Sequence, residues 1–355
     1  MSAERRTLVT GAGGFIGGRL VEVMLQTPGY DPVPSLRRWS SAARIGRHPV
    51  EPVLCDILDA ARLEEVAGTV DAIVHSAVGN REVTVEGTRN VLEAALRAGV
   101  GKVVHLSTVD VYGRATGRVG EDRELVVTDR EYGDSKIEAE RVCREYAERG
   151  LDVVILRPTI VYGPFSELWT VEPAQRLSEG SWLLPKEACM GTCNLVHVDD
   201  LVRAVLLALD TDGVSGRAYN VNGPDRPTWQ AYVEALNAAL DLPPLSPPPS
   251  TSARARTTVV EPFRKLVKGV YFRFEDPIMS IYKGSRPARL AMKWLQGLLQ
   301  RVPSPAEYDL YGRVVDFPTE RARSDLGYEP RIGMTDGVAS SVEWLLHEGV
   351  VVPRE

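Results

Sequence analysis

The sequence lacks the features that would place it outside the ordinary globular class. Four cysteines in 355 residues are too few for the disulfide framework of a small secreted domain. No uncharged apolar run is long enough to cross a bilayer, and the start, MSAERRTLVT, lacks the apolar core of a secretory leader. Charge is nearly balanced, with 42 Lys+Arg against 48 Asp+Glu. We therefore expect a cytoplasmic protein, and we expect neither a nucleic-acid partner nor a membrane partner.

A metal site is not expected either. Cys189, Cys193 and His197 are spaced at i, i+4 and i+8. The two-residue gap between cysteines that is usual in zinc ribbons is missing, however, and no fourth ligand stands nearby. Reduced structural thiols are the simpler interpretation.

The length and the changes of pattern along the chain predict two lobes. With 44% apolar and 25% charged residues, the chain is long enough to bury a sizeable core. We assign residues 1–165, with 194–225 returning to them, to one domain, and residues 166–193 and 226–355 to a smaller C-terminal lobe for the substrate. That lobe contains a basic insertion, 251–301, with eleven Lys/Arg against three acidic residues. Such an excess favours an anionic ligand, a lipid or a partner protein.

The N-terminal half alternates short apolar runs with segments of helical periodicity. Strands are expected near 7–10, 33–36, 53–54, 72–75, 102–106 and 152–156, and helices near 18–26, 60–66, 85–98 and 134–149. Parallel neighbours need crossover connections, so this alternation indicates βαβ units. The expected fold class is α/β, a doubly wound parallel sheet of the Rossmann type.

A glycine-rich turn follows the first expected strand. The glycines of the Gly11-x-x-Gly14-x-x-Gly17 run, with Gly13 between them, allow a tight turn, close approach of a pyrophosphate, and close packing of helix on strand. The helix that follows supplies backbone N–H groups and partial positive charge for phosphates. This context, a strand, a turn and a helix, predicts a dinucleotide site.

The end of the second strand bears on which nicotinamide dinucleotide binds. An acidic residue there would hold a ribose 2′-hydroxyl, whereas an arginine would accommodate a 2′-phosphate. The strand ends on Arg37 and Arg38, and Asp31 precedes it. These residues favour NADP, with NAD as the alternative. Asp56, after the third strand, would accept a hydrogen bond from the adenine edge.

A candidate catalytic set follows the cofactor loop in the sequence. Ser107 and Thr108 end a strand, and Tyr132 and Lys136 are four residues apart in a helical segment, so their side chains face the same way. A nearby ammonium lowers the pKa of a phenol, which would make Tyr132 a proton donor and acceptor. Thr108 would orient the substrate oxygen, and Lys136 would also reach the nicotinamide ribose.

In order and context, these motifs resemble the extended short-chain dehydrogenases/reductases, the nucleotide-sugar epimerase/dehydratase family. The matching stretches are TGAGGFIGG, CDILD, HSA, VEGTRNVLEAA, HLSTVDVYG, YGDSK, LRPTIVYGP and NLVHVDDLVRA. The resemblance implies a catalytic centre of Thr108, Tyr132 and Lys136, a substrate such as an anionic nucleotide-sugar, and a homodimer built through the helices near 85–98 and 134–149. It also implies further cofactor contacts, at Phe15, Ile16, Ile57, Ser76, Ala77, Ser107, Pro158 and Ile160.

Departures from the family pattern leave the reaction open. Dehydratases of this kind carry Thr-Asp-Glu, whereas this chain has Thr108, Val109 and Asp110. Val109 cannot donate a proton, which removes the acid of that mechanism. Asp110 stands where related decarboxylases and dehydratases have a glutamate base, although it could instead bind backbone near its turn. Internal redox on a nucleotide-sugar is the leading hypothesis. The alternatives are an NADPH-dependent reductase of a secondary-metabolite or sterol-like ketone, and a non-catalytic dinucleotide sensor.

Overall fold

The computed structural model describes residues 4–246, 251, 255, 257–262 and 302–351. Contacts divide the chain into two units: Met1–Trp169 with Asn194–Arg226 and Val315–Gly337, and Thr170–Cys193 with Pro227–Val314 and Val338–Glu355. Residues 315–337 therefore group with the first unit, whereas the sequence analysis assigned them to the C-terminal lobe. The basic insertion 251–301 lies, except for 251, 255 and 257–262, outside the described residues.

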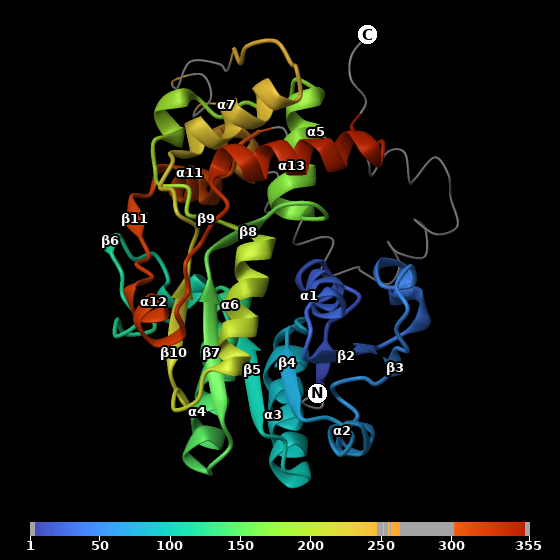
Figure 1. The fold of residues 1–355 in the computed structure, drawn as a ribbon. Helices are drawn as coiled ribbons and strands as arrows, with labels where there is room; N and C mark the ends of the chain where they lie inside the picture. The colour runs from blue at the N-terminus through green and yellow to red at the C-terminus, as the bar shows by residue number, and fades with distance from the viewer. Residues whose placement is uncertain (1–3, 247–250, 252–254, 256, 263–301, 352–355) are drawn as a thin grey trace. The chain divides into compact units, whose positions relative to one another are not determined.

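A seven-stranded parallel sheet forms the centre of the first unit (Figure 1). Its order is β10-β7-β5-β4-β1-β2-β3, and the chain reverses its direction of winding at β1. The strands are β1 (Arg5–Thr10), β2 (Tyr30–Leu36), β3 (Val53–Leu54), β4 (Ala72–His75), β5 (Lys102–Leu106), β7 (Val153–Pro158) and β10 (Ala218–Val221). Ligands bind at such a reversal, beyond the carboxyl ends of the strands. The prediction of a doubly wound α/β fold is confirmed.

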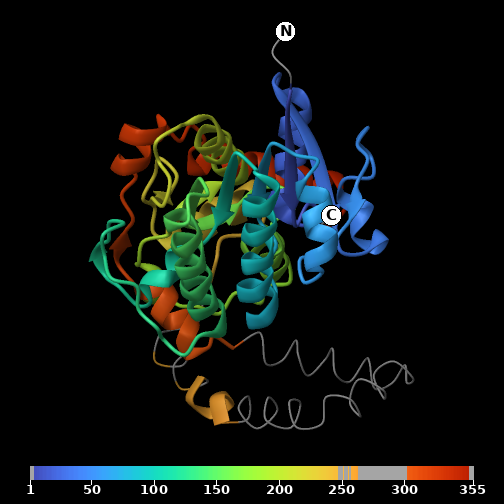
Figure 2. The same cartoon turned by 90° about the horizontal axis from the view of Figure 1, so that it is seen from below.

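Helices cover both faces of this sheet. One face packs against α1 (Phe15–Gln26), α6 (Val198–Asp210) and α12 (Glu320–Leu326). The other packs against α2 (Ala60–Ala67), α3 (Arg81–Ala98) and α4 (Glu131–Glu148), with α3 and α4 side by side (Figure 2). Successive strand residues belong to opposite cores, as Val103 and Val104 do. Burial on both faces explains why the strands read as continuous apolar runs.

Short elements complete the first unit. Two small parallel pairs join β6 (Gly117–Arg118) to β11 (Val315–Asp316) and β8 (Ile160–Tyr162) to β9 (Leu195–His197). Two 3-10 turns, η1 (Trp39–Arg44) and η2 (Val109–Tyr112), follow β2 and β5. Both turns therefore start at the carboxyl edge of the main sheet.

The second unit is helical where the structure describes it. It contains α5 (Glu172–Ser178), the 3-10 helix η4 (Lys186–Cys189), α7 (Trp229–Ala239) and α11 (Pro305–Gly312). In its aromatic core Trp229 packs on Tyr311 with the rings tilted by 45° and their centroids 4.3 Å apart, and Trp182 lies edge-on to Tyr311. The division of the chain into units falls within η3 (Glu167–Val171) and within α13 (Met334–His347). Among the described residues, no helix combines the length and apolarity that a membrane span requires.

Candidate active site

The glycine turn connects β1 to α1 as the sequence predicts. Gly11 has φ +72°, a conformation that glycine adopts without strain, and Gly14 N–H donates to the Gly11 carbonyl at 2.9 Å. Gly14 is the N-cap of α1 and contributes no side-chain hydrogen bond to the first turn. By contrast, α2, α3 and α6 each have a side chain that accepts from their first N–H groups. Phe15 and Ile16, half-buried, open α1.

Close packing explains why the turn needs its other glycines. A Cβ on Gly17 would collide with the Gly11 carbonyl oxygen, and one on Gly13 would lie 2.5 Å from the carbonyl oxygen of Ser41. Side chains at these positions would therefore displace the backbone of the turn or of η1. The small turn and the uncapped helix end fit the phosphates of a dinucleotide. These residues would hold the cofactor by its pyrophosphate.

The loop after β4 lies against the glycine turn. Ser76 Oγ donates to the Thr10 carbonyl at 2.6 Å, and Ala77 N–H donates to Thr10 Oγ1 at 3.3 Å. A Cβ on Gly11 would approach Ala77 N to 2.9 Å. The structure thus brings Ser76 and Ala77 together with the turn.

Asp56 and Ile57 follow β3 and have mainly local contacts. Asp56 is half-buried, and its Oδ1 accepts from Leu58 N–H at 3.1 Å. Ile57 is buried, and its side chain occupies the space that a Cβ on Gly87 would need. One carboxylate oxygen of Asp56 is therefore already hydrogen-bonded to the backbone of its own turn.

Arg37 and Arg38 leave the end of β2 as exposed side chains. Asp31, at the opposite end of that strand, forms an ion pair with Arg6 at 3.5 Å. The Asp31 carboxylate is thus far from the C-terminal end of β2. The charged side chains at that end are those of Arg37 and Arg38. The turn η1 follows directly and packs Ser41 over Gly13.

Arg44, at the end of η1, is a buried cation near the glycine turn that no sequence motif marks. Its side chain is 7% exposed and lies over Gly18 of α1, with the guanidinium carbon 3.4 Å from the centre of the Phe165 ring. One nitrogen reaches Glu22 at 3.2 Å, while Nε and Nη1 have no hydrogen-bond partner among the described residues. Burial lowers the Arg44 pKa to about 10, and the negative charge of Glu22 partly offsets this effect. Arg44 therefore remains a cation beside the first turns of α1.

The proton-transfer candidates meet at the end of β5. Thr108 is 8% exposed, its Oγ1 accepts from Asp110 N–H at 3.2 Å, and its side chain is near enough to the phenol of Tyr132 to lower the Tyr132 pKa. Gly133 allows the start of α4 to pack closely on η2, because a Cβ at Gly133 would lie 3.2 Å from the Asp110 carbonyl oxygen. Tyr132 keeps 47% of its surface exposed. Thr108, Asp110 and Tyr132 thus form one cluster, which we call the outer layer.

The prediction that Lys136 lowers the pKa of Tyr132 is wrong for this arrangement. Burial of the phenol and the charge of Asp110 raise the Tyr132 pKa, and the nearby Thr108 side chain only partly offsets them. Lys136 is 3% exposed, and its Nζ donates to the Leu106 carbonyl at 2.6 Å. Burial lowers the Lys136 pKa to about 8. Helical spacing aligns the two residues, but the strand carbonyl holds the ammonium.

Ser107 is buried and turned away from the outer layer. Its Oγ donates to Glu140 Oε1 at 2.6 Å, and its N–H donates to the Leu156 carbonyl at 2.7 Å. Pro158, which ends β7, is buried, and Ile160, which begins β8, is half-buried. The structure therefore gives the Ser107 hydroxyl a protein partner and places Pro158 and Ile160 at the neighbouring strand end.

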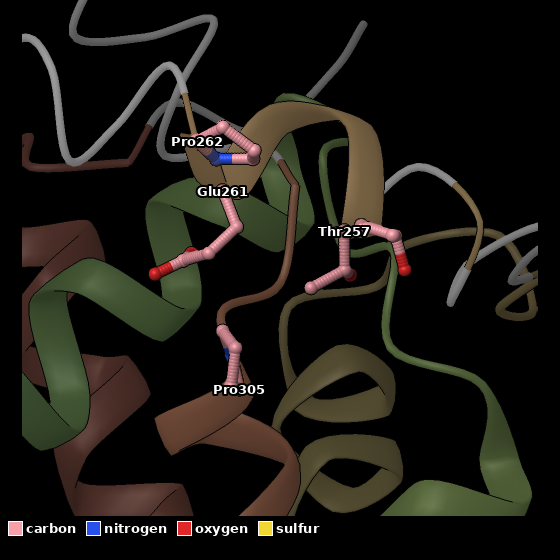
Figure 3. Close-up of a pocket in the computed structure, with 5 residues that line it drawn as sticks. Thr257, Glu261, Pro262 and Pro305 are labelled. Atoms are coloured by element: carbon pink, nitrogen blue, oxygen red, sulfur yellow. The ribbon is translucent and has the colours of Figure 1, made fainter.

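A separate cavity of about 400 Å³ lies in the second unit (Figure 3). Its lining consists of Thr257, Thr258, Glu261, Pro262 and Pro305. None of the predicted cofactor or catalytic residues lines it. The four cysteines are free and buried, and no cluster of His, Cys, Asp and Glu suited to a metal occurs in the part of the chain that the structure describes.

Comparison with known proteins agrees with this geometry. The sequence profile of the NAD dependent epimerase/dehydratase family matches residues 7–222. A dTDP-glucose 4,6-dehydratase from Streptomyces antibioticus is 31% identical over 240 residues, which cover 61% of this chain and 71% of the relative. Sterol demethylase protein B from Methylococcus capsulatus is 30% identical over 233 residues, 61% of this chain and 69% of the relative.

A solved structure shares the architecture. The dTDP-glucose 4,6-dehydratase from Streptomyces venezuelae, with NAD and TYD bound, superposes with a TM-score of 0.70 at 25% identity, covering 96% of this chain and 97% of that one. The matched profile spans the glycine turn, the end of β5 and the Tyr132/Lys136 helix. The chain belongs to the NAD-dependent epimerase/dehydratase family of extended short-chain dehydrogenase/reductase enzymes.

Proposed function

We propose that this enzyme uses a nicotinamide dinucleotide to oxidise or reduce an oxygen-bearing carbon of a nucleotide-sugar. The observation that carries the proposal is the cluster of Thr108, Asp110 and Tyr132 at the carboxyl end of β5. In the sheet, β4 alone separates β5 from β1, which carries the glycine turn. Neighbouring strands are roughly 4.8 Å apart. The proton-transfer pair and the cofactor turn therefore share one sheet edge.

Tyr132 and Thr108 have different roles in the proposed proton transfer. When bound, the nicotinamide accepts or donates a hydride at the reacting carbon. A raised pKa keeps Tyr132 a neutral phenol, which donates its proton to a substrate oxygen and takes it back in the reverse direction. Thr108 orients that oxygen, and the Lys136 ammonium, one helical turn further along α4, would contact the nicotinamide ribose.

Replacement of the phenol tests this assignment. We expect Tyr132→Phe to lower turnover roughly 10²- to 10⁴-fold, because the proton donor is lost. Cofactor affinity, measured by fluorescence titration, stays near the wild-type value because the glycine turn is unaltered. A Tyr132→Phe enzyme with full turnover would remove Tyr132 from the mechanism.

For the cofactor we propose NADP, with NAD as the alternative that the family description and the NAD-bound relative favour. The support is the exposed Arg37 and Arg38 at the end of β2, with the Asp31 carboxylate at the other end. Arg37→Ala should weaken NADPH binding much more than NADH binding. Arg62→Ala, on the surface of α2, serves as the control. Equal weakening of both cofactors in Arg37→Ala would refute a role for the arginine at the 2′-phosphate.

The substrate proposal follows the dTDP-glucose dehydratases among the relatives, with one reservation about chemistry. Val109 leaves no side-chain acid beside Thr108, and this favours epimerisation, decarboxylation or simple ketone redox over dehydration. Asp110, whose charge acts on Tyr132, is the proposed second acid–base residue. Asp110→Asn should lower conversion if a carboxylate base is used, and unchanged conversion would contradict that role.

Reduction of a sterol-like or secondary-metabolite ketone is the second candidate, supported by the similarity to sterol demethylase protein B. A thermal-shift panel separates the two. UDP-sugars and dTDP-sugars should raise the melting temperature under the first proposal, because binding to the native state stabilises it. Consumption of NADPH with steroid or aliphatic ketones, without any shift from nucleotide-sugars, would favour the second.

Assembly and location belong to the same proposal. We propose a cytoplasmic homodimer formed through α3 and α4. The free buried thiols fit a reducing compartment. Ion pairs within the chain join the two helices, Arg81 with Glu138 and Arg89 with Glu145. Light scattering should show a dimer, and a monomer at every protein concentration would contradict this proposal.

A further inference from the structure

A buried charged pair lies beneath the outer layer. Arg157, at the end of β7, is 1% exposed, and Glu140 of α4 is fully buried. Arg157 Nε donates to Glu140 Oε1 at 2.8 Å and Nη2 donates to Oε2 at 2.6 Å, so the pair is bidentate. Well-packed apolar residues in place of such a pair are often as stable or more stable. Stability alone therefore does not account for its presence.

The pair connects the elements that carry the candidate site. Glu140 accepts from Ser107, the residue before Thr108, and Glu140 follows Lys136 by one helical turn. Arg157 precedes Pro158, and its Nη1 donates to the hydroxyl of Tyr112 at 2.7 Å. Tyr112 belongs to η2, the turn that also contains Asp110. One ion pair thus joins β5, β7, η2 and α4.

Among the described titratable groups that act on Lys136, Glu140 carries the negative charge. His75 of β4 and His105 of β5 also face the lysine; burial and the Lys136 charge lower both of their pKa values, that of His75 to about 3, so both rings are neutral. Burial raises the pKa of the Cys143 thiol, which stays protonated. Although burial favours protonation of Glu140, the hydrogen bonds and charge of Arg157 and the Ser107 hydroxyl keep its pKa below the ordinary value. Glu140 is therefore ionised.

We propose that Glu140 and Arg157 are positioning residues that align the end of β5 with α4 and hold Lys136 as an ammonium ion through the fixed negative charge of Glu140. The inference rests on the proposed function, because it concerns the lysine of the same centre. Burial alone drives Lys136 toward the neutral amine, and Glu140 opposes that loss. Arg157 keeps Glu140 ionised and oriented, and Arg144 donates a fourth hydrogen bond to Glu140 at 2.8 Å from the helix surface.

The direct test is a titration of Lys136 in Glu140→Gln. Lysine labelled with ¹³C at Cε is followed by NMR, and the Lys136 signal is assigned by its absence in Lys136→Met. We expect the Lys136 pKa to fall by roughly one unit or more in Glu140→Gln, because an opposite charge that favours the ammonium is removed. The alkaline limb of the turnover profile should move to lower pH by the same amount, with KM little changed.

Two further variants keep the test decisive. Glu140→Gln leaves Arg157 without its partner and can impair folding, so Glu140→Gln/Arg157→Met removes both charges together. The Lys136 pKa should remain low in the double variant even though its folding stability recovers. Glu138→Gln removes a charge from another face of α4, where Glu138 pairs with Arg81, and should leave the Lys136 pKa unchanged.

The outcomes separate this inference from the proposed function. An unchanged Lys136 pKa in Glu140→Gln or in the folded double variant would overturn the inference, and so would an equal shift in Glu138→Gln. The titration requires neither substrate nor turnover. Failure of the proposed function would appear instead as full turnover in Tyr132→Phe.

Discussion

The outer layer differs from the buried layer beneath it, which consists of Lys136, Glu140 and Arg157, in the interactions that hold its residues. Thr108, Asp110 and Tyr132 lie together at a partly exposed surface, where Thr108 accepts a hydrogen bond from Asp110 N–H and Tyr132 keeps 47% of its area accessible. Lys136, Glu140 and Arg157 are at most 3% exposed and interact through charges and charge-assisted hydrogen bonds. The outer layer is accessible to a substrate but is not rigid by itself. The buried layer supplies fixed geometry, and it does so with charges whose desolvation is costly.

The largest expected effect concerns His75, a buried neutral histidine that faces Lys136. His75 titrates near pH 3 in the folded protein, against an ordinary value near 6.5. The unfolded chain therefore binds the extra proton first, and stability is lost as the pH falls from 6.5 toward 3, by up to about 5 kcal/mol from this residue. His75→Gln should flatten that acid dependence in urea unfolding, while His347→Gln, on the surface, should not. Equal acid sensitivity of wild type and His75→Gln would contradict the neutral buried state.

The next effect comes from breaking the ion pair on one side only. Arg157→Met leaves a buried carboxylate without its bidentate partner, and we expect the free energy of unfolding to fall by about 3 to 5 kcal/mol. Arg149→Met removes a partly exposed arginine that pairs with Glu93, and should cost far less. Denaturant melts of both variants measure the difference. Similar losses would mean that the buried and surface pairs are equivalent.

A third prediction concerns the cofactor turn. Gly17→Ala places a Cβ against the Gly11 carbonyl and should displace the start of α1. A displacement of about 1 Å is expected to reduce turnover about a hundredfold, with cofactor affinity falling as well. Gly68→Ala is a matched control, because its Cβ would meet the nearest atoms at 3.6 Å. Normal cofactor titration of Gly17→Ala would show that the turn tolerates a side chain.

The smallest expected effect lies where the two layers join. The Tyr112 hydroxyl accepts from Arg157 and donates to Asn220 Oδ1 at 2.8 Å. Tyr112→Phe keeps the ring and should cost about 1.5 kcal/mol in unfolding free energy, since one of these hydrogen bonds involves a charge. A small loss of turnover should accompany it, because η2 carries Asp110. A turnover loss as large as that of Tyr132→Phe would place Tyr112 in the reaction itself.

Periodicity and turn chemistry were sufficient to predict the sheet and the glycine turn. Apolar runs separated by helical segments predicted six of the strands of the parallel sheet, and the glycine spacing located the start of α1 within a few residues. These are local properties of the chain. The helix spacing of Tyr132 and Lys136 was correctly expected as well.

Side-chain partners were the part that the sequence did not reveal. Lys136 bonds to a carbonyl of β5 rather than acting on Tyr132, because the strand lies under α4. The network of Ser107, Glu140 and Arg157 depends on residues brought together from β5, α4 and β7. Arg44 carries no motif, and its burial follows from the groove that Gly18 leaves in α1. Contacts between distant segments have no periodic signal.

The order of the strands also determines when the site can exist during folding. The central strand β4 pairs with β1 on one side and with β5 on the other, so the segments carrying Gly11 and Thr108 reach the same region of the sheet edge only after both of these pairings have formed. Pairings of such long sequence separation form slowly. Binding competence should therefore appear only in the last kinetic phase of refolding.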